Sequence, residues 1–306
     1  MSVKRVALQF PEGLLMYSLL IADILRLFGT SPSNPTVDIV ILGDVTYGAC
    51  CIDDRNASLV GCDFLIHYGH SCLVPIDCCR IKVLYVFVDI AFDPSHLIAP
   101  ICHNFPSKSK LALMGTVQFL TTLNSVKTTL VSQHNYTNLS IPQERPLSPG
   151  EVLGCTSPSL SSSSTYDAVL YVADGRFHLE AIMIANPSLP AYKYDPYDKR
   201  MTREYYKHSD MHSIRLLAIE KARQPGQTFG IIVGTLGRQS NPKVIKQLKG
   251  LLLSNQIPFV TVTISEIMPA KLALFDWVDV WIQSSCPRLS IDWGSAFDRP
   301  ILTPYE

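Results

Sequence analysis

Nine cysteines occur among the 306 residues, and Cys50 and Cys51 form one of two adjacent pairs, the other being Cys78 and Cys79. Such a pair can form a disulfide, bind a metal, supply a thiol nucleophile or fill the core. The first residues enter a strand pattern directly, without the apolar core of a signal peptide, which predicts a cytoplasmic protein. Since disulfides are rare in reducing compartments, metal binding or catalysis is the better expectation for any specialised cysteine.

Three cysteines share a position just beyond the C-terminal end of a predicted strand. They are Cys50 after VDIVILGD, Cys155 after EVLG and Cys286 after DVWIQSS. Ligand crevices of open α/β sheets form at this end of the strands. No paired CxxC units, as in a zinc ribbon, accompany them. Three thiolates from three parts of the chain would suit an iron–sulfur cluster, whereas the alternative for each cysteine is core filling, a common role of free cysteine.

Three successive series of strands and helices would position these cysteines. Apolar runs such as RVALQF and TFGIIVG are continuous, as in parallel strands covered on both faces. We therefore expect an α/β fold of three similar domains with mostly parallel sheets. The predicted domains are residues 1–107 with Cys50, 108–225 with Cys155 and 226–306 with Cys286.

Helices are expected where apolar residues recur at helical spacing or a helix start and stop can be recognised. The expected helices cover residues 12–29, a stretch ending near 131, residues 202–224 with Thr202 as the cap, and residues 242–253.

Composition excludes two classes of partner. Lys+Arg and Asp+Glu are equal at 26 each, so the basic excess of a broad nucleic-acid surface is absent. The most apolar run, at 83–92, contains Asp89 and is far shorter than the ~20 residues that span a membrane. We expect neither direct nucleic-acid binding nor a membrane span.

Six sequence blocks between residues 43 and 294 carry a family resemblance that extends from about residue 6 to residue 306. The blocks are GDVTYGACCIDD, HYGHSCLVP, GEVLGCTSP, YVADGRFHLEA, GTLGRQ and QSSCPRLSIDWG. Together they resemble the first-step enzymes of diphthamide biosynthesis, the subunit 1 group of eukaryotic-type 2-(3-amino-3-carboxypropyl)histidine synthases.

This resemblance implies a transferase whose three α/β domains surround a central iron–sulfur site, a [4Fe–4S] cluster, with S-adenosyl-L-methionine as cosubstrate. The cluster ligands carry over onto Cys50, Cys155 and Cys286, one from each domain, with Cys51 as a packed neighbour. The implied reaction moves the 3-amino-3-carboxypropyl group, as a radical, to C2 of a histidine on translation elongation factor 2. The implied partners are a paralogous second subunit, giving a heterodimer, and a small electron donor with a CSL-type zinc finger.

Two alternative functions remain open beside this one. The first is a [4Fe–4S] enzyme of the quinolinate synthase kind, in which the open iron acts as a Lewis acid. The second is a non-catalytic subunit of a heterodimer. Retention of all three cysteines favours the catalytic role.

The glycine-rich stretch GTLGRQ is the predicted cosubstrate site. It follows a strand and precedes a helix, where backbone N–H groups can reach an anion, and Arg238 could pair with a carboxylate. An ordinary turn between strand and helix explains the same residues equally well. The residues concerned are Gly234, Gly237, Arg238 and Gln239.

Four further residues are candidates for lining the active site. His70 follows a strand in HYGHS, and Arg176 and His178 follow another in DGRFH, where Asp174 as a helix cap is the alternative interpretation. Arg288 comes two residues after Cys286, where a cation would favour thiolate charge, or where it could form a surface salt bridge.

Overall fold

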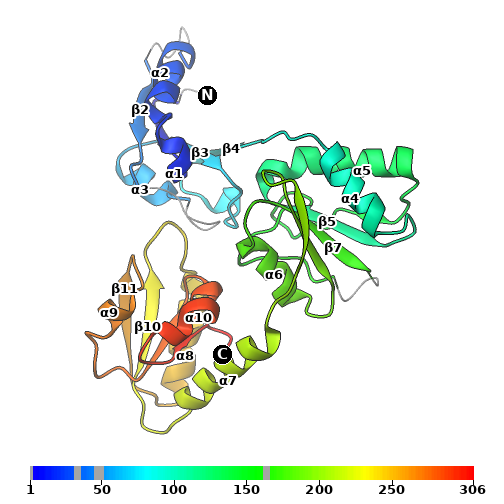
Figure 1. Ribbon diagram of the computed structural model, residues 1–306. Helices are drawn as coiled ribbons and strands as arrows, with labels where there is room; N and C mark the ends of the chain where they lie inside the picture. The colour runs from blue at the N-terminus through cyan, green and yellow to red at the C-terminus, as the bar shows by residue number, and fades with distance from the viewer. Residues whose placement is uncertain (1–2, 31–35, 45–51, 161–165) are drawn as a thin grey trace. The chain divides into compact units, whose positions relative to one another are not determined.

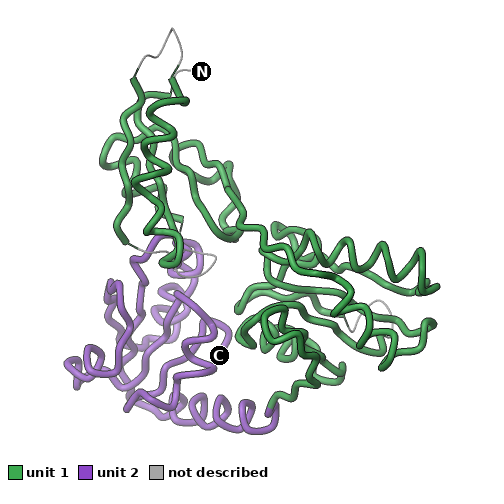
Figure 2. The backbone as a smooth tube through the Cα atoms, turned by 45° about the horizontal axis from the view of Figure 1, so that its top comes forward, with its two compact units in different colours: residues 1–206 green, residues 207–306 purple. Residues whose placement is uncertain are grey.

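Three β-sheets organise the protein, which we describe from a computed structural model (Figure 1). The structure describes residues 3–30, 36–44, 52–160 and 166–306. The chain divides into two compact units, residues 1–206 with two of the sheets and residues 207–306 with the third (Figure 2).

The first sheet has the strand order β2-β1-β3-β4, and all its strands are parallel. Its strands are β1 (Arg5–Gln9), β2 (Asp38–Ile41), β3 (Phe64–Gly69) and β4 (Lys82–Phe87), and its helices are α1 (Glu12–Leu15), α2 (Ser18–Phe28) and α3 (Asp54–Leu59). Side chains alternate across β1, so that Leu8 packs with Ala22 of α2 and Ala7 packs with Ala57 of α3. Both faces of the sheet are therefore covered, as the continuous apolar strands predict.

The second sheet has the order β6-β5-β7-β8-β9, and its last strand is antiparallel. Its strands are β5 (Leu111–Gly115), β6 (Leu139–Ser140), β7 (Ala168–Val172), β8 (Ala191–Asp195) and β9 (Arg200–Glu204), and its helices are α4 (Ser95–Asn104), α5 (Leu120–His134) and α6 (Phe177–Ala185). Leu113 and Leu170 lie in one buried cluster with Leu123 of α5 and Leu179 of α6. This cluster is the core of the second sheet.

The third sheet has the order β11-β10-β12-β13, again entirely parallel. Its strands are β10 (Phe229–Gly234), β11 (Phe259–Ile264), β12 (Val280–Gln283) and β13 (Ile301–Leu302), and its helices are α7 (His208–Ala222), α8 (Pro242–Ser254), α9 (Pro269–Leu272) and α10 (Pro287–Trp293). Gly230 of β10 lies against the buried indole of Trp281, and a Cβ there would collide with the ring. The absence of a side chain at residue 230 thus allows the largest buried side chain to fill this core.

The predicted fold class is confirmed, since three mostly parallel sheets with helices are present. The expected helices ending near 131 and covering 242–253 correspond to α5 and α8. The expected helix at 12–29 is interrupted between α1 and α2. The stretch EVLG is no regular strand, because it forms only isolated bridges, Gly115 with Glu151 and Leu153 with Thr156.

The single helix expected at 202–224 is wrong in its first part. Residues up to Glu204 form β9, and the helix α7 begins only at His208, so Thr202 is not its cap. A turn after β8 causes the difference, because the Asp195 carboxylate accepts hydrogen bonds from the backbone N–H groups of Tyr197 and Asp198. These bonds reverse the chain and pair β9 with β8.

The helix α7 lies in the unit of the third sheet, although the predicted boundary at 225/226 placed it in the second domain. Its buried Arg215 donates to the backbone oxygen of Ile301 in β13 and to that of Ser290 in α10. These bonds fasten the helix to the third sheet. The division of the first 206 residues into two domains stays a prediction.

Candidate functional site

Cys286 lies at the carboxyl end of the third sheet, where two serines separate it from the last residue of β12. It is the N-cap residue of α10. Its side chain is half-buried. A proline at the first helical position, Pro287, suits the start of α10 because that position has no intrahelical N–H partner. The prediction that Cys286 follows the end of a strand therefore agrees with the third sheet.

The side-chain amide of Gln283 holds the turn that carries Cys286. Its Oε1 accepts from the backbone N–H of Ser285 at 2.9 Å and from that of Cys286 at 3.0 Å. Its Nε2 donates to the backbone oxygen of Cys286 at 2.6 Å and to Ser290 Oγ at 3.0 Å. Sequence reasoning missed this residue, although a glutamine ending an apolar strand next to a proposed ligand is a usable signal.

The GTLGRQ loop lies beside the Cys286 turn. A Cβ on Gly234 would collide with Ser285 Oγ and come within 2.8 Å of Gln239 Oε1, so a larger residue there would displace these two side chains. Ser240, a second residue that sequence reasoning missed, donates to the Gly234 oxygen at 3.0 Å and contacts Ser284 Oγ at 3.1 Å. Two loops from neighbouring strands are therefore joined at this edge.

Gly237 and Arg238 belong to the same loop. Gly237 has a φ of 50°, a left-handed conformation that glycine adopts without strain. Arg238 is half-buried. Their proposed contact with a cosubstrate stays a prediction.

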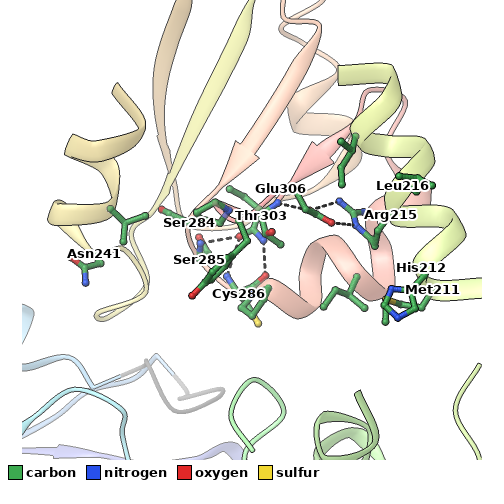
Figure 3. Close-up of a pocket in the computed structure, with 17 residues that line it drawn as sticks. Met211, His212, Arg215, Leu216, Asn241, Ser284, Ser285, Cys286, Thr303 and Glu306 are labelled. Atoms are coloured by element: carbon green, nitrogen blue, oxygen red, sulfur yellow. Dashed lines mark hydrogen bonds and ion pairs between the residues drawn. The ribbon is translucent and has the colours of Figure 1, made fainter. Parts of the chain in front are cut away.

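A cavity of about 780 Å³ opens next to Cys286, within the unit of the third sheet (Figure 3). Its wall is mostly apolar and includes Leu216 and Ile219 of α7 and Val244 of α8. Arg215 and Glu306 face each other across a two-pronged ion pair, with bonds of 2.7 and 2.8 Å. This volume lies in the range of cavities that take small molecules.

Arg288 is buried and pairs with Asp292 one turn later on α10, at 2.8 Å. The predicted surface salt bridge is therefore a buried ion pair within the helix. The wall of the cavity includes Cys286, Pro287 and Ile291 but not Arg288. An influence of its charge on the thiolate stays a prediction.

Cys155 is exposed at the tip of a tight turn in the segment between β6 and β7 of the second sheet. Leu153 and Thr156 close this turn through two backbone hydrogen bonds of 3.1 and 3.2 Å. The neighbouring Gly154 is buried against the ring of Phe177 in α6, where a Cβ would collide with ring atoms. Gly154 thus lets the turn pack on α6 while its cysteine points outward.

Arg176 joins the start of α6 to the end of β9. Its guanidinium forms ion pairs of 2.9 Å with Glu180 and Glu204, and it donates to the backbone oxygen of Tyr205. His178 is half-buried and contacts the ring of Phe177. The alternative of Asp174 as the helix cap is wrong, because the N-cap residue is Arg176 and has no side-chain cap bond.

His70 lies in a buried aromatic group at the end of β3. Its ring centroid is 5.4 Å from that of His67, which is also 5.4 Å from the ring of Tyr85. His67 Nδ1 is 3.0 Å from Gln9 Oε1. Within the described part of the chain, the buried Nε2 atoms of both histidines lack hydrogen-bond partners, which fits a structural or site-lining role for His70.

A complete metal-ligand set is not assembled within the described residues, since these contain no group of three or more His, Cys, Asp or Glu side chains that could hold an ion. Cys50 and Cys51 lie outside the residues that the structure describes. The two described candidates nevertheless fit an iron–sulfur cluster in chemistry, because both are thiols on turns with surface access. Beside Cys286, the buried Ser285 hydroxyl also lacks a partner among the described residues.

The helices in the described residues are all too short or too polar to cross a membrane.

A family model for "putative diphthamide synthesis protein" matches residues 10–306. Three similar curated proteins are each named 2-(3-amino-3-carboxypropyl)histidine synthase subunit 1. The protein of Schizosaccharomyces pombe is 55% identical over 307 residues, that of Gibberella zeae 52% over 303, and that of Gallus gallus 53% over 304. The alignments cover 99% of this chain and 69%, 64% and 71% of those proteins, so the chain spans about two thirds of their length.

Two solved structures are also similar, both of Dph2 from Pyrococcus horikoshii. The first has a TM-score of 0.77, and the second, which contains a 4Fe-4S cluster, has a TM-score of 0.78. Each is 26% identical to this chain, and the alignments cover 99% of this chain and 84% of the solved chains.

Proposed function

The chain belongs to the diphthamide synthesis family, and we propose that it is the catalytic subunit of a synthase that attaches a 3-amino-3-carboxypropyl group to a histidine. The proposed substrate histidine belongs to translation elongation factor 2, and the proposed donor is S-adenosyl-L-methionine. Since the family match extends over residues 10–306, it favours this activity over a quinolinate synthase type of enzyme.

The observation that carries the proposal is the placement of Cys155 and Cys286. Each lies on a short turn with access to solvent. The Cys155 turn packs against the ring of Phe177, and the Cys286 turn is hydrogen-bonded to Gln283. Thiols held in this way can bind a group outside their own domain, whereas core-filling cysteines are enclosed. Cys50, Cys155 and Cys286 are the residues that would hold a [4Fe–4S] cluster.

A reduced cluster, when bound, would supply the electron that breaks the bond between the sulfonium and the methionine γ-carbon, so that the aminocarboxypropyl radical forms and methylthioadenosine leaves. The residues of this chain would bind and orient the cosubstrate. Arg238 in the loop beside Cys286 is the proposed partner of its carboxylate. The apolar cavity next to Cys286 has the volume to take the nucleoside part and to exclude water from it.

The proposed partners follow from the family. They are a paralogous second subunit, as the name "subunit 1" of the relatives implies, and a small electron donor with a CSL-type zinc finger. The proposed setting of this reaction is the cytoplasm.

Product analysis tests this function directly. The chain, reconstituted anaerobically with iron and sulfide and combined with the second subunit, is reduced with dithionite in the presence of S-adenosylmethionine. Methylthioadenosine should accumulate, and it should be absent when dithionite is omitted. Finding 5′-deoxyadenosine as the sole nucleoside product would refute the proposed bond cleavage, and no cleavage by a fully loaded cluster would favour the non-catalytic subunit.

A further inference from the structure

Gln283 uses all the hydrogen-bonding directions of its side chain on the residues around Cys286. It is the last residue of β12 and only 1% exposed. One amide atom accepts the N–H groups of residues 285 and 286, while the other donates to the Cys286 oxygen and to Ser290 in α10. Through Gln283, the backbone before and after the Cys286 side chain is hydrogen-bonded to the end of β12.

We propose that Gln283 is a positioning residue for the Cys286 thiolate, an inference that rests on the proposed function. Its four hydrogen bonds fix the backbone on both sides of the sulfur and tie the turn to the first part of α10. A cluster ligand must be held in place before the iron binds, because each residue that moves on binding reduces the affinity.

The same bonds have an electronic consequence. The N–H groups of residues 285 and 286 are engaged by Gln283 Oε1, at 2.9 and 3.0 Å, and so are not free to donate fully to the thiolate. Hydrogen bonds to the sulfurs are among the factors that set the potential of an iron–sulfur cluster. Gln283 therefore competes with the sulfur for two hydrogen-bond donors while adding no charge.

Glutamine is the side chain that meets both needs. Glutamate would keep the two acceptor contacts but lose both donor contacts and add a buried negative charge beside the ligand. Leucine would leave the N–H groups and the Cys286 oxygen without their partner, and the turn would loosen.

The first test measures the position of the thiol and needs no metal. Each cysteine of the metal-free full chain is alkylated with iodoacetamide, and its rate is followed by peptide mass spectrometry. In Gln283→Leu, Cys286 should react several-fold faster than in the wild type, because the turn is released, while the exposed Cys155 serves as the internal reference and keeps its rate. Gln227→Leu is the matched control, since Gln227 precedes β10 at the opposite end of the same sheet.

An equal rate of Cys286 in Gln283→Leu and the wild type would overturn the positioning role. If that variant fails to fold, Ser290→Ala replaces it, because this change removes a single one of the four bonds and should increase the rate of Cys286 in the same direction by less.

The second test measures the cluster in the reconstituted protein. The reduction potential, followed by electron paramagnetic resonance, should be more negative in Gln283→Glu than in the wild type, and unchanged in Gln227→Glu. A wild-type potential in Gln283→Glu, with full iron content, would contradict the electronic part of the inference. Failure of the wild type itself to bind a cluster would instead refute the proposed function, and the alkylation test would still decide the positioning role.

Discussion

At the scale of single residues, His67 is a buried histidine in a fixed neutral form. Gln9 Oε1 accepts the backbone N–H of Asp53, so it faces His67 as an acceptor, and His67 donates through Nδ1. Burial, with the charge of His70 as a smaller cause, lowers the pKa of His67 to about 3. The other ring packed on it is that of Tyr85. His67 is therefore uncharged in the folded protein over the physiological range of pH.

This lowered pKa predicts a loss of stability in acid. Between the ordinary histidine pKa of about 6.5 and the folded-state pKa of about 3, the unfolded chain binds a proton that the folded chain does not. The contribution of neutral His67 to the free energy of unfolding is present above pH 6.5. It decreases by about 2 kcal/mol by pH 5. The free energy of unfolding, measured in urea at pH 7 and at pH 5, should decrease by about 2 kcal/mol less in His67→Gln than in the wild type. The control His103→Gln, at an exposed position on α4, should behave as the wild type, and equal losses in all three proteins would contradict the assignment.

At the scale of elements, the apolar strands could be predicted from the sequence and the polar ones could not. The runs of β1, β5 and β10 are continuous and apolar because helices cover both faces of their sheets. The strands β8 (AYKYD) and β9 (RMTRE) are the last two of their sheet, with β9 at its edge. Both carry charges, so their pattern resembles a helix start or a loop. Their pairing in the sheet identifies them, since β8 pairs with β7 and with β9.

In the candidate site, too, some features could be predicted from the sequence and others could not. The position of Cys286 after a strand could be predicted, because apolar patterning locates the strand end. The role of Gln283 could not, since it depends on hydrogen bonds to the backbone of a turn whose shape no local pattern encodes. The same holds for Gly154, which is required by the ring of Phe177 from a later helix.

The packing of the Cys155 turn on α6 predicts the effect of one methyl group. Gly154→Ala would push against the Phe177 ring, and overpacking of this kind costs about 1–3 kcal/mol. Thermal unfolding should therefore show a lower midpoint for this variant. Gly175→Ala is the matched control, because no atom lies within 4 Å of a Cβ at Gly175, and it should leave the midpoint nearly unchanged. Phe177→Leu combined with Gly154→Ala should recover part of the loss, and a Gly154→Ala midpoint equal to that of the control would contradict the packing.

At the scale of the whole molecule, the three proposed ligands come from three different stretches of sequence. Cys155 is in the unit of residues 1–206 and Cys286 in the unit of residues 207–306, while Cys50 follows β2 in the sequence. No single turn of the described chain holds a metal-ligand set by itself. The proposed cluster therefore depends on the whole folded chain, and a neighbouring residue cannot replace a lost ligand.

The most direct measurement is the iron content of the anaerobically reconstituted chain and of its cysteine variants. The wild type should bind about four irons per chain, as a cubane cluster requires. Cys50→Ala, Cys155→Ala and Cys286→Ala should each lose the cluster, whereas Cys51→Ala, the adjacent control, should keep its iron nearly unchanged. A full cluster in all three of the first variants would contradict the account.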